Sequence, residues 1–304
     1  MDHTPTEAPF AASASLGAPE QVAASRWVVM KFGGSSVSTA DNWLTISGLI
    51  RNRLAEGLRP VIVHSALAGV SNRLEQALGA ACSGEQSDAV QLIREQHYQL
   101  ADALGIDAPA LLDAHLHELQ QLVAGVRLIR EVSVRVRVRV MALGELMATR
   151  LGAAYLAGAG LPVEWVDARD NLTSESGRGG GQRPRDYLSA RCAAGPDTAL
   201  AARFEALGSV VLTQGFIARN PWGETVLLGR GGSDTSAAYF ASRLEARRLE
   251  IWTDVPGMFT ADPRVVPSAR LLLALHYDEA EELASAGSSV LHPRCVSPLR
   301  ASAI

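Results

Sequence analysis

The sequence predicts an α/β protein with a mainly parallel sheet, and two observations lead to this fold class. Residues 27–32 and 60–64 are short, largely apolar runs of the kind that forms strands buried on both faces of a sheet. A glycine turn and a helical segment lie between them, which is the strand–helix–strand order of βαβ units. The 304 residues are 47% hydrophobic and 20% charged, which suits one large globular domain.

The first 25 residues differ from the rest of the chain. They are rich in Ala, Ser, Thr and Pro and contain no Lys or Arg. A signal peptide needs a basic start and an apolar block, and an organellar transit peptide is rich in Arg. We therefore predict that residues 1–25 are a disordered lead-in and that residues 26–304 form one α/β domain.

Helices are expected after each of the first two strands. The first should begin at Thr39 with Ser38 as its N-cap, and it should close at Gly57, which can take a left-handed terminal conformation. The second is expected over 70–81. Residues 88–123 carry helical periodicity with few breakers.

The segment 134–147 gives conflicting signals. Residues 134–140 alternate Val and Arg like a half-exposed strand, but they continue into residues 141–147, which favour a helix. We expect a helix through Glu145. Farther along, strands are expected over 163–167, 210–217, 225–228 and 249–253, a loop over 174–185, a turn at 220–223 and a helix over 277–286.

Charge and composition exclude several classes of function. The net charge is −4 and the pI is about 6.0, so no basic surface is predicted for nucleic acid, and no apolar run is long enough to span a membrane. Cys82, Cys192 and Cys295 are too widely spaced for a disulfide framework or a metal knuckle, which indicates a cytoplasmic location. His115 and His117 would point apart on a helix, so no metal site is predicted.

The segment 31–37, which reads KFGGSSV, is the first candidate site. Lys31 ends a buried strand, and two glycines and two serines follow it into a helix. Backbone amides, a helix N-terminus and an ammonium group at one point favour an anion such as a phosphate. The spacing is not that of a Walker loop, and a simple tight turn beside a surface lysine is an equally good interpretation of this segment alone.

Two more segments leave strands with polar residues. Residues 228–235 (LGRGGSDT) contain Arg230, which could clamp a carboxylate, although Asp234 could merely cap a helix. Residues 251–257 (IWTDVPG) place polar groups and a turn at the end of a strand, where open α/β sheets bind ligands.

Taken together with residues 144–147 (GELM) and 213–217 (TQGFI), these segments resemble the signatures of the aspartate kinase catalytic domain, in the same order and over about residues 28–299. The resemblance implies the amino acid kinase fold, a three-layer α/β/α sandwich with a mainly parallel central sheet. It also implies transfer of the ATP γ-phosphate to the β-carboxylate of L-aspartate with Mg²⁺. This is the first step toward lysine, threonine and methionine, and a homo-oligomer is implied as well.

The resemblance also implies roles for individual residues. Lys31 and Asp234 are expected at the reacting centre. Glu145 would hold the amino group of the substrate, and Arg230 its α-carboxylate. The aspartate pocket would comprise Ser65, Ser71, Glu145, Phe216, Arg230 and Ser233, and the nucleotide would meet Gly33, Gly34, Ser35, Gly231, Gly232, Thr253, Asp254, Phe259 and Arg264. Without the resemblance, Glu145 would be interpreted as an exposed helical carboxylate and Phe216 as a core aromatic.

The sequence departs from the family pattern at three places. Ser289 stands where the family usually has a lysine, and Phe259 replaces a common tyrosine. The chain ends at Ile304, where the family continues into a final strand, so that strand is expected to be missing from the sheet. A second enzyme fused beyond residue 304, such as diaminopimelate decarboxylase, is suggested by resemblance alone. Two rival interpretations are a kinase of another small amino acid and a nucleotide-binding fragment without turnover.

Overall fold

The computed structural model describes residues 24–175, 183–286 and 291–304. The predicted lead-in lies almost entirely outside these ranges, as do most of the predicted loop over 174–185 and the departure at Ser289. Within the described ranges, we find no helix that combines the length and the apolar character needed to cross a membrane.

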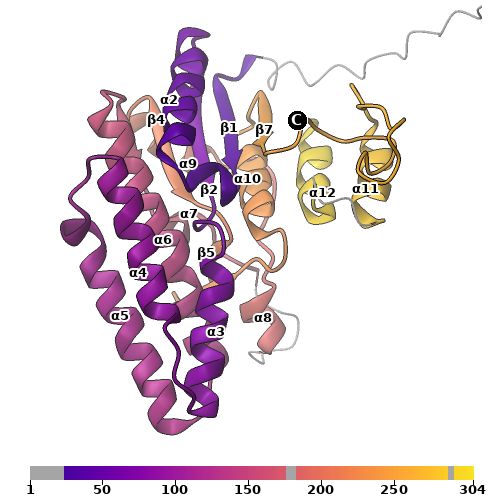
Figure 1. Ribbon diagram of the computed structural model, residues 1–304. Coiled ribbons are helices and arrows are strands. Elements are labelled where there is room, and N and C mark those ends of the chain that lie inside the picture. The colour runs from indigo at the N-terminus through magenta and orange to yellow at the C-terminus, as the bar shows by residue number, and fades with distance from the viewer. Residues whose placement is uncertain (1–23, 176–182, 287–290) are drawn as a thin grey trace, which may run out of the picture.

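Five parallel strands form the central sheet, in the order β3-β4-β2-β1-β7 (Figure 1). Their bounds are β1 (Trp27–Phe32), β2 (Arg59–His64), β3 (Val163–Trp165), β4 (Val210–Gln214) and β7 (Arg248–Trp252). Lys31 of β1 lies between Val63 of β2 and Ile251 of β7. The predicted α/β class with a mainly parallel sheet is therefore confirmed.

Helices cover both faces of this sheet, which gives the three expected layers. α2 (Ala40–Ala55) and α6 (Val134–Gly158) pack against β2, β3 and β4. α10 (Gly232–Arg243) packs against β1, β2 and β7 and has α9 (Thr198–Ala206) beside it. The central strands are consequently buried on both sides, as their apolar runs predict.

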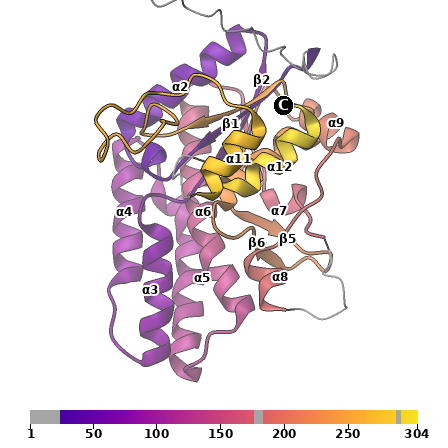
Figure 2. The ribbon, with the colours of Figure 1, turned by 90° about the vertical axis from the view of Figure 1, so that its right-hand side faces the viewer.

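The C-terminal helices add material outside α10. α12 (Pro293–Ser302) lies on α10, and α11 (Tyr277–Ser285) lies on α12 (Figure 2). The helix expected over 277–286 is thus confirmed. His292 caps α12, because its side chain accepts a hydrogen bond from the amide of Arg294 at 3.3 Å.

A helical bundle extends beyond the sheet (Figure 1). It consists of α3 (Val70–Ser83), α4 (Ala89–Ala103), α5 (Ala108–Ile129) and the first part of α6. The helical periodicity over 88–123 is confirmed, but it belongs to two helices. They separate at Gly105, whose φ of 68° is left-handed and ends α4.

α6 is helical along its whole length, although its first residues alternate Val and Arg like a strand. Ser133 caps its N-terminus by accepting a hydrogen bond from a first-turn amide. Arg137 forms an ion pair with Glu75 of α3, and Arg139 forms one with Glu118 of α5. Successive arginines therefore face different helices of the bundle, which explains why the alternation does not mark a strand.

The strand predicted over 210–217 is in fact two strands. β4 ends at Gln214, and β5 (Ile217–Arg219) pairs antiparallel with β6 (Thr225–Leu227) around the predicted turn. The chain changes direction at Phe216, whose φ is 68°. The remaining short elements are η1 (Ser35–Val37), α7 (Ala168–Asn171) and α8 (Pro184–Leu188).

Two buried histidines predict a pH dependence of stability. Burial lowers the pKa of His64 and of His97 from 6.5 to about 4, and one backbone hydrogen bond opposes this shift in each case. A lowered folded-state pKa gives stability that is present above pH 6.5 and is lost as the pH falls toward 4. For one such histidine the loss at pH 5 is about 2 kcal/mol.

We test this with His97→Leu, which removes one of the two titrating groups. Between pH 7.5 and 5.0, the unfolding free energy measured by urea denaturation is expected to fall by about 2 kcal/mol less in the variant than in the wild type. The other titrating groups are common to both proteins and cancel in this comparison. Equal slopes would contradict the assignment.

Candidate active site

The two glycine-containing segments predicted as ligand sites meet at the carboxyl edge of the sheet. Lys31 is near the end of β1, and Asp234 is in the first turn of α10. The distance from Lys31 Nζ to Asp234 Oδ1 is 2.7 Å, and the side chains are only 13% and 14% exposed. The structure thus joins residues 203 positions apart into one shielded ion pair at a helix N-terminus.

Glu145 reaches the same place from the middle of α6. It is 3% exposed, so the alternative interpretation as an exposed helical carboxylate is wrong. Burial raises its pKa well above the usual value, and a backbone hydrogen bond at Ala66 and the charge of Lys31 oppose this only in part. Its Oε2 atom is buried and has no hydrogen-bond partner among the described residues. An acceptor in this condition is suited to a cationic ligand group.

A serine and a phenylalanine contact the first turn of α10 from the segments that follow β2 and β4. Ser65 Oγ lies 3.0 Å from Ser233 Oγ, which joins the end of β2 to the first turn of α10. The Phe216 ring lies against Gly232, where a Cβ atom would come 2.5 Å from Phe216 Cδ2. Gly232 is therefore needed for this close approach. Phe216 is only partly buried, and it packs against the hydrophobic core.

The turn after β1 is held by Ser38 and not only by its glycines. Ser38 Oγ donates to the carbonyl of Gly34 at 2.6 Å and accepts from the amide of Ala68 at 2.9 Å. The prediction that Ser38 caps the following helix is wrong, because Thr39 accepts the capping hydrogen bond. At Gly34 a Cβ atom would lie 2.7 Å from the carbonyl oxygen of Ala66, so only glycine fits.

A small pocket lies between α2 and the ends of β1 and β7. Its volume is about 270 Å³, and its lining includes three of the residues predicted to meet the nucleotide, Ser35, Thr253 and Asp254. The rings of Phe32 and Trp252 stack at 6.3 Å between centroids and form its apolar part. An aromatic surface beside the backbone amides of a turn can accommodate a base and its phosphates.

Four predicted residues are not joined to this cluster by any hydrogen bond or ion pair between described residues. Ser71 lies in the first turn of α3, and Arg230 is exposed in the loop before α10. Phe259 forms an isolated bridge with Leu271, and Arg264 is paired with its neighbour Asp262 on the surface. Their roles stay predictions.

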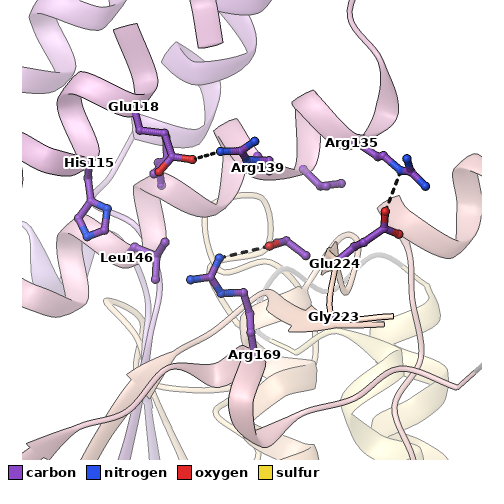
Figure 3. Close-up of a pocket in the computed structure, with 11 residues that line it drawn as sticks. His115, Glu118, Arg135, Arg139, Leu146, Arg169, Gly223 and Glu224 are labelled. Carbon is purple, nitrogen blue, oxygen red and sulfur yellow. Dashed lines mark hydrogen bonds and ion pairs between the residues drawn. The ribbon is translucent and has the colours of Figure 1, made fainter. Parts of the chain in front are cut away.

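A second hollow lies on the other side of α6, between α5 and the β5–β6 hairpin (Figure 3). Its volume is about 490 Å³. Arg139 is paired with Glu118, and the distance from Arg135 Nε to Glu224 Oε1 is 2.9 Å. None of the predicted site residues lines this hollow. It is therefore separate from the candidate active site.

Two residues that were not predicted from the sequence, Ser236 and Ala66, also contact the site residues. Ser236 is fully buried in α10, accepts from the amide of Phe216 at 2.8 Å and donates to the carbonyl of Gly232 at 2.9 Å. Ala66 contributes through its main chain, at Gly34 and at Glu145. A serine four residues after a glycine in a helix indicates a backbone hydrogen bond, but nothing in the sequence identifies its second partner.

A sequence profile of the amino acid kinase family matches residues 26–304, nearly the whole described chain. The chain belongs to the amino acid kinase family. This chain is 34% identical over 286 residues to aspartokinase 2, chloroplastic, of Arabidopsis thaliana, and the aligned part covers 90% of this chain and 50% of that relative. The chain therefore spans about half the length of the aspartokinases of this kind that it matches.

The fold of this chain also agrees with a solved structure, the Escherichia coli aspartokinase III in complex with aspartate and ADP. The TM-score is 0.74 at 31% sequence identity, with 90% of this chain and 60% of that chain covered. A bifunctional aspartokinase/homoserine dehydrogenase of Haemophilus influenzae is 33% identical over 285 residues, 89% of this chain and 33% of the relative. Its second enzyme is a dehydrogenase, so it gives no support to the suggested fusion with a decarboxylase.

Proposed function

We propose that this chain transfers the γ-phosphate of ATP to the β-carboxylate of L-aspartate, giving 4-phospho-L-aspartate and ADP. The observation that carries the proposal is the buried, unpartnered Oε2 of Glu145 beside the pair of Lys31 and Asp234. An ammonium group would satisfy that oxygen and compensate a charge that is costly to bury. A substrate that carries both an amino group and a carboxylate is thereby favoured, and the similar solved protein was crystallised with aspartate and ADP.

The chemistry requires little from the protein beyond charge neutralisation. A free aspartate carboxylate has a pKa of about 3.9, so it is ionised at neutral pH and no general base is needed. One of its oxygens forms a bond to the γ-phosphorus, while the bond from that phosphorus to the β–γ bridging oxygen breaks and ADP leaves with the electron pair. Lys31 and the N-terminus of α10 would offset the repulsion between the two anions.

Arg230 is proposed to hold the α-carboxylate of the substrate. It is exposed and forms no ion pair with any described residue, so its guanidinium is available for a two-point contact. Ser65, Ser71, Phe216 and Ser233 would complete the pocket. The nucleotide is proposed to contact the turn at Gly33, Gly34 and Ser35, the loop at Gly231 and Gly232, and Thr253, Asp254, Phe259 and Arg264.

Mg²⁺ is proposed to arrive with the nucleotide. In the described ranges, no three side chains of His, Cys, Asp or Glu gather in a group that could hold a metal ion. Mg²⁺ commonly binds through substrate phosphates and one or two carboxylates. When bound, it would neutralise charge on the phosphates. The site otherwise depends on Lys31 and backbone amides for this purpose.

Three further proposals concern the setting of the reaction. A cytoplasmic location is supported by Cys82, Cys192 and Cys295, which are all free thiols. A homo-oligomer and a role in making lysine, threonine and methionine rest on the resemblance to aspartate kinases. Light scattering of the purified protein tests the first of these two.

The activity is tested by aspartate-dependent ADP release with Mg-ATP, with hydroxylamine present to trap the acyl phosphate. We expect hydroxamate with aspartate and none with glutamate. Hydroxamate with a different amino acid would replace aspartate as the substrate. Binding of ATP by calorimetry without any product would instead indicate a nucleotide-binding domain without turnover.

A further inference from the structure

We propose that Thr149, Gln214 and Trp165 form a positioning cluster that fixes the place of Glu145 and thereby limits the length of the substrate. The inference rests on the proposed function, because it concerns the same pocket. The three side chains come from α6, from the end of β4 and from the end of β3. None of them touches the reacting groups, so their effect would be exerted through Glu145.

Thr149 is the centre of the cluster. Its side chain is fully buried, and Oγ1 accepts hydrogen bonds from Gln214 Nε2 at 2.9 Å and from Trp165 Nε1 at 3.0 Å. The same hydroxyl donates to the carbonyl of Glu145 at 2.8 Å. A hydroxyl has one proton and two acceptor sites, so this one is fully used. A satisfied buried network of this kind favours a single arrangement of the elements that it joins.

Gln214 extends the cluster to the end of β4 and to the start of α7. Its Oε1 accepts from the amide of Ala168 at 2.7 Å, which fixes the orientation of the side-chain amide. In the chain, Gln214 immediately precedes Gly215 and Phe216, where the backbone turns with a φ of 68°. Gln214 therefore ends β4, holds α6 through its hydrogen bond to Thr149, and begins the turn that leads to Phe216.

The geometry of α6 explains why this bracing matters. Glu145 lies one turn before Thr149, and Gly152 lies on the same face beyond it. At Gly152 a Cβ atom would come 2.3 Å from Trp43 Cη2, so the helix approaches its neighbours as closely as a glycine permits. Glu145 thus has a fixed depth relative to the sheet.

Lys31 belongs to that sheet, so the seating of α6 sets the separation between the ammonium-binding carboxylate and the phosphate-binding amine. Aspartate and glutamate differ by one methylene between their amino group and the carboxylate that would react. A fixed separation between Glu145 and Lys31 would distinguish them, whereas a loosely seated α6 would not. The cluster is therefore a specificity-determining feature of this site.

The test uses three threonine variants in the full chain. Thr149→Val removes the central hydroxyl and keeps the shape, and Thr149→Ser restores it. Thr213→Val is the matched control, because Thr213 is equally buried but its hydroxyl has no hydrogen-bond partner among the described residues. Thr149→Val is expected to raise the KM for aspartate about tenfold and to lower the preference for aspartate over glutamate about tenfold, with little change in the KM for ATP.

We expect Thr149→Ser to restore the KM for aspartate and the preference for aspartate over glutamate. We expect Thr213→Val to have the kinetic constants of the wild type. Wild-type kinetic constants in Thr149→Val would overturn the inference and leave the cluster a purely structural feature. If Thr149→Val does not fold, Trp165→Phe removes one of the same hydrogen bonds and is measured in the same way.

Activity assays of the wild type show separately whether the proposed function is wrong. If the wild type acts on another acid, the variants are assayed with that acid. If it acts on none, hydrogen exchange of the α6 amides decides, and we expect faster exchange in Thr149→Val than in Thr213→Val. Equal exchange would refute the positioning role.

Discussion

Replacing Glu145 by glutamine is expected to raise the KM for aspartate about 10- to 100-fold while making the folded protein more stable. Burial raises the pKa of this carboxyl well above its usual value, so its charge is costly in the free protein at neutral pH. A neutral amide of the same shape removes that cost. The amide also loses the ion pair with the substrate ammonium, and a hydrogen bond to a charged group contributes about 1.5–3 kcal/mol.

The pH dependence of stability gives a second measurement of the same variant. A raised folded-state pKa gives stability that is present below the ordinary pKa of 4.5 and is lost as the pH rises toward the raised value. The stability advantage of Glu145→Gln, measured by urea denaturation, should therefore grow between pH 4.5 and 7.5. This direction is opposite to that expected for the buried histidines.

Glu164→Gln is the matched control, because Glu164 is an exposed carboxylate on β3. It should change neither the KM for aspartate nor the pH dependence of stability. An unchanged KM in Glu145→Gln would remove Glu145 from substrate recognition. Opposite changes in stability and in substrate affinity are typical of a residue kept for function at a cost in stability.

The strands of the fold could be predicted from the sequence because their signal is local. Residues 27–32 and 60–64 are apolar apart from Lys31 and His64, and a strand buried on both faces requires a largely apolar run. The start of α6 was harder to predict as a helix. Its arginines pair with residues of neighbouring helices, and those helices are distant in the sequence. The strand predicted over 210–217 failed at Phe216, where a non-glycine residue takes a left-handed conformation that tertiary contacts impose.

The candidate site could be predicted only in part, because only some of its residues belong to a local sequence pattern. Glycines and a lysine at the end of a strand indicate an anion site on general grounds. Nothing local shows that Glu145, in the middle of a long helix, is buried beside that lysine, and only the resemblance to a family identified it. The hydrogen bonds of Thr149 and the main-chain contacts of Ala66 depend on packing between separate elements, so no local pattern records them.

Replacing Lys31 by methionine is expected to lower kcat by about 10² or more, because one preorganised cation next to the transferred phosphate is lost. Lys31 is the only lysine among the 28 Lys and Arg residues of the chain. Because all the remaining Lys and Arg positions of the chain are arginine, the lysine at position 31 indicates a specific need for an ammonium group at this site. An ammonium is a compact charge on a flexible stem, whereas a guanidinium is planar and needs a fixed, wider space. Lys31→Arg is therefore expected to lose most of the turnover as well.

The same uniqueness allows a chemical test without mutation. Reductive methylation of the protein can modify only one ε-amine, that of Lys31, in addition to the N-terminal amine. Mass spectrometry of the peptide that contains Lys31 then reports its reactivity directly. We expect saturating ATP to slow this modification, because phosphates would cover the amine. Equal modification with and without ATP would place the nucleotide elsewhere.

A paired substitution separates the catalytic effect of Lys31 from its effect on stability. Lys31→Met leaves the Asp234 carboxylate, which is 14% exposed, without its cation 2.7 Å away, and should destabilise the fold by about 1–3 kcal/mol. The double variant Lys31→Met/Asp234→Asn removes both charges and should recover most of the unfolding free energy. Its kcat should remain as low as that of the single variant, because the phosphates still lack the ammonium group. Recovery of kcat together with stability in the double variant would show that Lys31 only holds the loops together. Near-wild-type turnover in Lys31→Arg would show instead that a guanidinium can replace the ammonium group.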